Sequence, residues 1–194
     1  MAKQLLVGAG VGSGIAQAPA FVMRAADSHI ENSSKHPDTL GLDSVEAAIE
    51  SLAAQLEGKA RDPLTGSQNN GGDVLLALVA MLRDPALHES IRDFMASGSG
   101  AERAVRGAFN SFARKLERLG GYFAERSADL QDLSSKVIDR LGGQTGEVDF
   151  PEEPFVLVTT ELSPILAASL KQTPVLAVIT EKGSATSHSA IITR

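Results

Sequence analysis

A single histidine, His188, lies in a segment whose residue types suit the transfer of phosphoryl groups. The run at residues 183–189 reads Gly-Ser-Ala-Thr-Ser-His-Ser, so hydroxyl side chains flank the imidazole, and apolar residues follow it. A neutral imidazole is a nucleophile near neutral pH. The free N–H groups and positive dipole end of a helix N-terminus stabilise a phosphoryl group. We therefore predict that a helix begins near His188 and that this histidine carries phosphorus.

The residues around His188 have predicted supporting roles. Thr186 or Ser187 can cap the new helix, and Gly183 lets the preceding turn bring its backbone close to the phosphoryl oxygens. Ser187 and Ser189 are further candidates for positioning those oxygens. A structural histidine at a capped helix start would explain the same pattern, and for an isolated histidine that is the more common case.

A second hydroxyl, that of Ser163, could fix the tautomer of the imidazole. Ser163 follows a predicted strand at residues 155–158 and precedes Pro164 at the start of a short predicted helix. These segments belong to the same α/β unit as His188, so Ser163 could hydrogen-bond the ring nitrogen that does not attack. Ser163 would serve equally well as a plain N-cap ahead of proline.

The hydrophobic patterns predict an α/β domain with a helical insertion. Strand patterns occur at both ends of the chain, and amphipathic helical patterns fill its middle. Strands are predicted at residues 5–7, 20–23, 155–158 and 175–179, and helices at 43–61, 74–82, 85–96, 101–119, 123–141 and 165–171. We expect an α/β domain formed by residues 1–30 and 146–194, with an inserted all-α subdomain like a four-helix bundle at residues 31–145.

Local signals predict where helices start and which face of one helix is buried. Asp43 or Ser44 is predicted to cap the first helix and Asp73 the second. Asp84 precedes Pro85, which stands at a first helical position where its missing N–H costs nothing. The buried stripe predicted for the helix at 101–119 consists of Ala104, Val105, Ala108, Phe112 and Leu116.

The composition excludes several classes of protein. The chain has no cysteine, so disulfides and thiolate metal sites are excluded, and a cytoplasmic location is expected. No apolar run approaches the roughly 18 residues of a membrane span, and no secretory leader is recognisable. The net charge of −6 argues against nucleic acid as a partner and favours a basic protein.

The segment at residues 183–194 resembles the phosphohistidine signature of phosphoenolpyruvate-utilising enzymes. It matches the order Gly, a small residue, any residue, Thr, any residue, His, followed by small and aliphatic residues and Arg194. One position departs, because Ser184 replaces the usual second Gly or Ala. The resemblance implies that His188 is the phosphorylated histidine. Ser163 stands where the family usually has threonine in a Leu-Thr-Pro segment.

The helical insertion is similar to that of one member, enzyme I of the bacterial sugar phosphotransferase system. Residues 122–139 are similar to the last bundle helix of enzyme I, with the distinctive run Glu-Arg-Ser-Ala-Asp-Leu-Gln-Asp at 125–132. Residues 74–95 are similar to its broken second helix. Pyruvate phosphate dikinase and phosphoenolpyruvate synthase share the signature, but the inserted bundle argues against a swivelling domain from either. The implied fold is the α/β swivelling phosphohistidine domain with its helical insertion.

The resemblance implies a protein partner, the phosphocarrier HPr, which docks on the bundle and accepts the phosphoryl group. Met81, Phe123 and Arg126 are expected to be at least partly exposed. The leucines and Phe123 would equally suit the bundle core, and Arg83 stands near positions that are acidic in better-known members. The positions that match the family's contacts are Leu78, Met81, Leu82, Asp84, Phe123, Arg126 and Asp129.

The resemblance also implies functions outside this sequence. Enzyme I binds phosphoenolpyruvate and Mg²⁺ in a C-terminal barrel and dimerises through that half, so we expect no metal site in these residues. We expect a piece of a larger protein whose α/β domain is incomplete at Arg194, and no autophosphorylation by this chain alone. A non-catalytic phosphocarrier-binding module is the alternative function.

Overall fold

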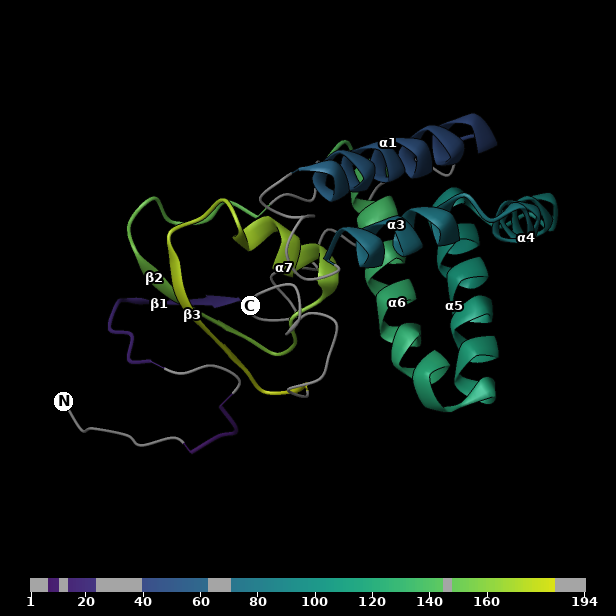
Figure 1. The fold of residues 1–194 in the computed structure, drawn as a ribbon. Helices are drawn as coiled ribbons and strands as arrows, with labels where there is room; N and C mark the ends of the chain where they lie inside the picture. The colour runs from purple at the N-terminus through teal and green to yellow at the C-terminus, as the bar shows by residue number, and fades with distance from the viewer. Residues whose placement is uncertain (1–6, 11–13, 24–39, 63–70, 145–147, 184–194) are drawn as a thin grey trace.

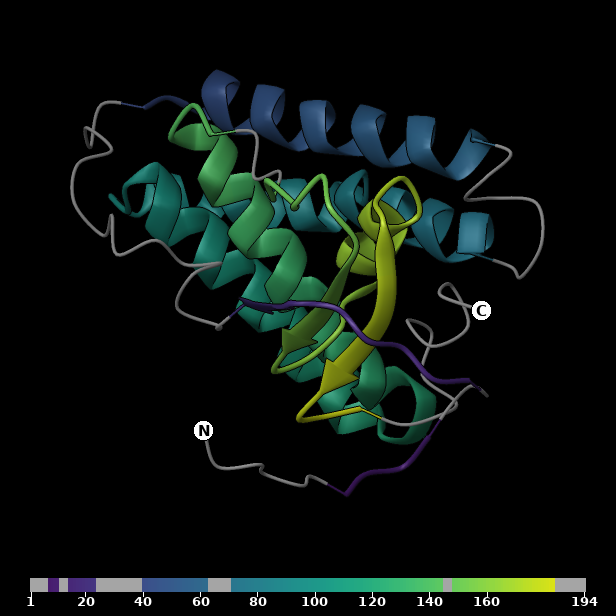
Figure 2. The same ribbon diagram turned by 90° about the vertical axis from the view of Figure 1, so that its left-hand side faces the viewer.

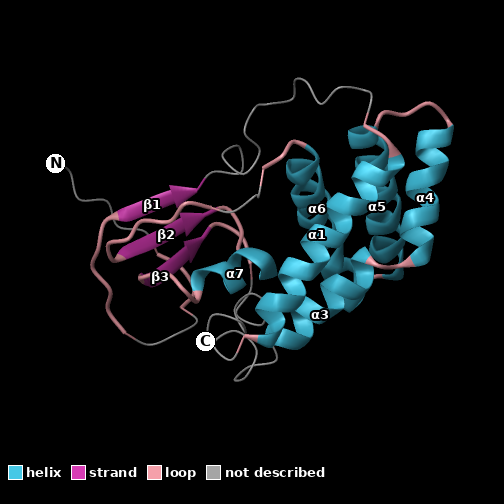
Figure 3. Cartoon of the chain, turned by 90° about the horizontal axis from the view of Figure 1, so that it is seen from above, coloured by secondary structure: helices cyan, strands magenta, loops and turns pink. Residues whose placement is uncertain are grey.

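The computed structural model describes residues 7–10, 14–23, 40–62, 71–144 and 148–183, and for 122–125 only the backbone is considered. A small sheet forms one end of the molecule and a group of helices forms the other, with a short helix between them (Figure 1, Figure 3). The expected combination of an α/β part with an inserted helical part is confirmed. The predicted boundaries near residues 30 and 146 lie outside the described residues and stay predictions.

The sheet contains three parallel strands in the order β1-β2-β3. Their register aligns Val22 with Val158 and Val158 with Ile179 in one cross-strand row. The strands are β1 Ala20–Met23, β2 Phe155–Thr159 and β3 Val175–Thr180. Helix α7, Pro164–Leu170, connects β2 to β3, as parallel pairing requires. Figure 2 shows the sheet in front of the helices.

One face of the sheet forms a closed apolar cluster, whereas the other is open among the described residues. Phe155 and Leu157 are fully buried, and the rings of Phe155, Phe21 and Phe150 lie 5.7–6.0 Å apart between centroids. Val22 and Ile179, on the opposite face, are 53% and 50% exposed. Alternation of side chains along a strand places these two sets on different faces.

The helical part surrounds a continuous apolar core. Helices α5 and α6 form a long antiparallel hairpin, α1 packs on α3, and α4 packs on α5 (Figure 1). Fully buried side chains on several of these helices meet in this core, among them Leu52, Leu75 and Phe109. The helices are α1 Leu42–Arg61, α3 Gly71–Leu82, α4 Pro85–Ala96, α5 Ala101–Leu119 and α6 Gly121–Leu141.

The predicted helices are present, but four of their starts differ from prediction. Helix α7 begins at Pro164, one residue before its predicted start. Gly41, not Asp43 or Ser44, occupies the N-cap of α1, and it makes no side-chain cap. Helix α3 already includes Gly71 and Gly72, which are both buried, so Asp73 lies in its first turn and complements the helix dipole there. Packing outweighs the low helix propensity of glycine at this start.

The chain reverses between α5 and α6 within two glycines. Gly120 and Gly121 have φ angles of +70° and +54°, which glycine adopts without steric cost, so α6 begins at residue 121 and not at 123 as predicted. A third glycine, Gly107 on α5, allows α4 to approach closely. A Cβ atom at that position would lie 2.9 Å from Cζ of Phe94.

Helix α7 joins the sheet to the helical part. Its Leu170 packs in the apolar cluster of the sheet, whereas Ile165 and Ala168 pack in the core of the helices. Two side-chain hydrogen bonds strengthen this junction. Lys59 Nζ donates to Ser169 Oγ at 2.8 Å, and Gln172 Nε2 donates to Asp62 Oδ2 at 2.9 Å.

Candidate functional site

The predicted nucleophile, His188, lies outside the described residues together with Thr186, Ser187 and Ser189. Their predicted roles therefore stay predictions. Gly183, the first residue of the motif, is described and has a φ angle of +128°, a conformation that favours glycine. A Cβ atom there would have ordinary space, 3.8 Å from Thr180 Oγ1, so backbone conformation and not crowding accounts for the glycine.

The carboxyl ends of β2 and β3 bring together the two segments that the sequence analysis linked. Beyond these strands, Glu181 N donates to Thr159 O at 3.1 Å and Lys182 N donates to Thr160 O at 2.8 Å. The turn that leads into the motif is thus fixed beside the loop that leads to Ser163. Ligands commonly bind at this edge of parallel sheets, because the loops there converge.

Ser163 is the N-cap of α7. Its Oγ accepts a hydrogen bond from Leu166 N at 3.2 Å, and Pro164 occupies the first turn. Ser163 therefore has the helix-capping role that the sequence allowed as an alternative. A serine hydroxyl has one hydrogen to donate and a second lone pair, so this cap is compatible with an additional bond to an imidazole.

An acidic residue of the helical part lies in a buried, charged environment next to the same loop. Asp129 on α6 pairs with Arg126, with Oδ2 and Nη1 3.5 Å apart. Burial raises the pKa of Asp129 to about 6; Arg126 opposes this rise, and the charges of Asp132 and Glu161 add to it. Glu161 lies two residues before Ser163, so α6 and the β2–α7 loop are electrostatically coupled at this junction.

The expected exposure of Arg126 is wrong, since this residue is only 6% exposed. Its guanidinium lies within the buried pair with Asp129, an arrangement that compensates part of the cost of burying either charge. The contribution of Glu161 was missed as well. Helical spacing relates Arg126 to Asp129, but no local pattern relates α6 to a loop about thirty residues away.

The residues predicted to contact a partner occupy different environments. Leu78 and Leu82 are fully buried and belong to the core, the alternative that the sequence left open. Met81 is half-buried at the end of α3. Asp84 is exposed, and its Oδ1 accepts a hydrogen bond from Ala86 N at 2.8 Å, so this residue is the N-cap of α4. The side chain of Phe123 lies outside the described residues.

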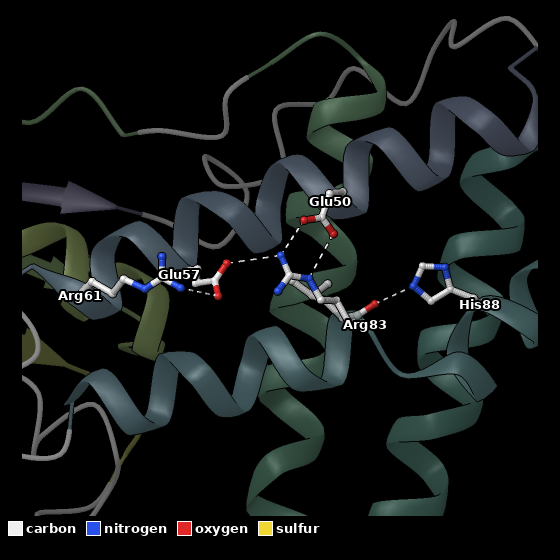
Figure 4. A network of polar contacts seen from close by, with 6 residues as sticks. Glu50, Glu57, Arg61, Arg83 and His88 are labelled. Atoms are coloured by element: carbon white, nitrogen blue, oxygen red, sulfur yellow. Dashed lines mark hydrogen bonds and ion pairs between the residues drawn. The ribbon is translucent and has the colours of Figure 1, made fainter.

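A network of charged side chains connects the α3–α4 junction to α1 (Figure 4). Arg83 binds Glu50 through two nitrogen atoms, at 3.1 and 2.5 Å, and contacts Glu57 at 3.4 Å. Glu57 also pairs with Arg61 at 2.9 Å. The hydrogen bond from Arg83 lowers the pKa of Glu50, and the same bond raises that of Arg83. The positive charge of Arg83 is therefore matched by α1.

His88 makes a structural contact at this junction. Its Nε2 lies 2.9 Å from the carbonyl oxygen of Leu82, one of the last carbonyls of α3 (Figure 4). Such carbonyls lack partners within their own helix. Since the ring nitrogen can donate to this oxygen, His88 links the end of α3 to α4.

The described residues contain neither a cluster of metal-binding side chains nor a membrane-spanning helix. Within ranges 7–10, 14–23, 40–62, 71–144 and 148–183, no group of three or more histidine, aspartate or glutamate side chains is placed to hold a metal ion. None of the helices in those same ranges combines the length and the apolar character needed to cross a membrane.

Comparisons with known proteins agree with this architecture. The family described as "PEP-utilising enzyme, N-terminal" matches residues 7–126, and "PEP-utilising enzyme, mobile domain" matches residues 151–194. A phosphoenolpyruvate-protein phosphotransferase of Streptomyces coelicolor is 40% identical over 148 residues, covering 76% of this chain and 26% of that protein. The corresponding protein of Staphylococcus carnosus is 30% identical over 205 residues, covering all of this chain and 34% of that protein.

Solved structures show the same fold. The structure entitled "N-terminal domain of Enzyme 1 - Nitrogen" is 25% identical, with a TM-score of 0.64, and the match covers 94% of this chain and 76% of that one. The chain spans at most about a third of the length of the phosphotransferases that it matches. The predicted resemblance is confirmed: the chain belongs to the family of phosphoenolpyruvate-utilising enzymes, and its similarity is to the N-terminal portion of enzyme I.

Proposed function

We propose that this chain forms the part of an enzyme I that relays a phosphoryl group from phosphoenolpyruvate, through His188, to the phosphocarrier HPr. The observation that supports this most directly is the arrangement at the carboxyl edge of the sheet. There the turn into the phosphohistidine motif is hydrogen-bonded beside the loop that carries Ser163. The names of the relatives, phosphoenolpyruvate-protein phosphotransferases, support the same activity. The proposal places the protein in the cytoplasm.

The proposed reaction consists of two displacements at phosphorus. One ring nitrogen of His188 attacks the phosphoryl group of phosphoenolpyruvate, and the bond between phosphorus and the enol oxygen breaks to release enolpyruvate. A ring nitrogen of an HPr histidine then attacks the same phosphorus, and the bond to His188 breaks. Catalysis by positioning suits both steps, because an in-line arrangement supplies much of the acceleration.

The residues around His188 have distinct proposed roles. The Ser163 hydroxyl holds the nitrogen that does not attack, so that the attacking nitrogen is unprotonated. Thr186, with helix N–H groups, binds the phosphoryl oxygens, and Ser187 and Ser189 assist. Gly183 allows the backbone of the turn to approach the phosphoryl oxygens. Family resemblance assigns Mg²⁺ to the barrel of enzyme I, and no role of this ion is proposed for the residues of this chain.

Transfer of label tests the proposal. HPr phosphorylated with radioactive phosphate is mixed with the chain, and the label bound to the chain is measured. Label held as phosphohistidine is stable in base and labile in acid. Label should move to the natural chain and to a His88→Ala control, but not to a His188→Ala variant. Binding of HPr without any transfer would indicate the alternative, a non-catalytic phosphocarrier-binding module.

A further inference from the structure

A buried hydroxyl lies on the apolar face of the sheet, at the end of β2 where the chain turns toward Ser163. Thr159 is only 8% exposed, and alternation along β2 places it on the same face as the fully buried Phe155 and Leu157. Its partner in the register of β3 is Thr180. A valine would occupy nearly the same space on this face without the cost of burying a polar group. Packing alone therefore does not account for the hydroxyl of Thr159.

Thr159 is hydrogen-bonded to both segments that meet at the carboxyl edge of the sheet. Its Oγ1 donates to Glu161 O at 3.2 Å, in the loop that leads to Ser163. Its own carbonyl oxygen accepts a hydrogen bond from Glu181 N at 3.1 Å, in the turn that leads into the motif. One residue thus connects the loop through its side chain and the turn through its backbone.

The loop between β2 and α7 is fixed directly before its capping serine. The Thr159 hydroxyl binds the carbonyl of Glu161. The next side chain, Leu162, is half-buried and packs in two apolar clusters, that of the sheet and a smaller one between α3 and α7. Ser163 then accepts the hydrogen bond from Leu166 N. The direction of the Ser163 hydroxyl therefore depends on how the two residues before it are held.

We infer that Thr159 is a positioning residue for the phosphoryl transfer, because it holds the loop so that the Ser163 hydroxyl meets the non-attacking ring nitrogen of His188. This inference rests on the proposed function and adds a residue outside the phosphohistidine motif. Thr159 acts through Ser163 and does not touch the phosphoryl group. The tautomer of an imidazole depends on the hydrogen bond at its second nitrogen. A small displacement of the group that makes this bond therefore slows a reaction that depends on alignment.

A purely structural role would explain the same hydrogen bond. Buried hydroxyls generally have a partner, and the carbonyl of Glu161 provides one. That explanation predicts that loss of the hydroxyl lowers stability and leaves the rate of transfer unchanged. A matched hydroxyl lies between the end of α7 and the start of β3, away from the carboxyl edge. There Thr173 Oγ1 donates to Leu170 O at 2.8 Å, so Thr173 provides the control.

The test measures two quantities for each variant: the single-turnover rate at which label passes from phosphorylated HPr to the chain, and the Kd for HPr. Thr159→Val should slow the transfer at least about tenfold without changing the Kd. Thr159→Ser keeps the hydroxyl and should restore the natural rate. Thr173→Val should transfer label at the natural rate, although denaturant unfolding should show that it loses about as much stability as Thr159→Val.

A double-mutant cycle with Ser163→Ala shows whether Thr159 acts through Ser163. Ser163→Ala should slow the transfer, and adding Thr159→Val to it should have no further effect, because the hydroxyl to be positioned is gone. Multiplying effects of the two substitutions would overturn the inference. So would a natural rate in Ser163→Ala.

The remaining outcomes separate the inference from the proposed function. If the natural chain accepts label and Thr159→Val accepts it equally fast, the inference is wrong while the proposed function stands. The same holds if Thr159→Ser is as slow as Thr159→Val, or if Thr173→Val is slowed to the same extent. If the natural chain accepts no label, the proposed function fails and the inference with it. Should Thr159→Val not fold, Thr159→Ala replaces it, and a natural rate in that variant would overturn the inference.

Discussion

The helical part and the sheet differ in how completely they bury their own apolar surface. Side chains such as Leu75 and Leu78 are fully buried among the helices, which form one closed core. In the sheet, Leu157 is fully buried on one face, whereas Val22 and Ile179 are about half exposed on the other. The helical part therefore has its own source of stability, whereas the sheet depends on α7 and its attachment to the helices.

A core leucine tests the first half of this comparison and has the largest expected effect. Leu78→Ala should lower the free energy of unfolding by about 2–5 kcal/mol, because it removes buried contacts and leaves a cavity. Denaturant unfolding followed by circular dichroism measures this. Leu76→Ala on the same helix, where the side chain is 42% exposed, should cost less than about 1 kcal/mol. If both variants lost equally little stability, Leu78 would not be a core residue, and its predicted role as a partner contact would be favoured.

The charged pair at the junction gives the next largest effect. The folded pKa of Asp129 is raised from 3.8 to about 6, so the folded state binds more protons than the unfolded chain between those pH values. Stability contributed by Asp129 therefore falls as pH rises through this window, by up to about 3 kcal/mol, and the penalty is complete above it. Asp129→Asn should remove this part of the pH dependence of unfolding. A carboxyl NMR titration midpoint near the ordinary value for aspartate would contradict the expectation.

The cap of α7 tests the second half of the comparison. Ser163→Ala should cost about 1 kcal/mol, because Leu166 N loses its acceptor. Hydrogen exchange should show the loss in α7 and β3 more than in α5 and α6. Ser163→Thr, which keeps the hydroxyl, should restore protection. Uniform loss over the whole chain would mean that sheet and helices unfold as one unit.

The network around Arg83 has the smallest expected effect. Glu50→Gln breaks exposed contacts that solvent and salt already screen, so the unfolding midpoint should stay nearly unchanged. A pronounced loss of stability that disappears in high salt would show that the network holds the α3–α4 junction against α1. Glu46→Gln, which breaks the pair with Arg92, is the matched control.

Periodicity predicted the helices and strands well because it reflects which face of an element is apolar. It did not predict what covers that face. Ala108 and Phe112 belong to the same stripe and the same core, yet Ala108 is fully buried whereas Phe112 is only half-buried. Likewise Leu78 and Met81 are three residues apart and neighbours on the surface of α3, but Leu78 is fully buried and Met81 only half-buried. Such differences depend on the ends of other helices, which the local sequence does not encode.

The candidate site was predictable to the extent that it follows from strand order. Parallel β2 and β3 place their carboxyl ends together, so the segments that lead to Ser163 and to Gly183 leave the sheet at the same edge. The burial of Arg126 could not be predicted from strand order. Arg126 pairs with Asp129, whose pKa also depends on the charge of Glu161 in a loop distant in sequence.

Gly107 sets how closely α4 can approach α5. Because this residue has no side chain, the Phe94 ring can lie where its Cζ atom would be only 2.9 Å from a Cβ atom at position 107. Helix α4 follows α3 almost directly, so a methyl group added at Gly107 would also displace the end of α3, where Met81 lies. Under the proposed function, this spacing belongs to the docking part of the protein and not to the segment that carries His188.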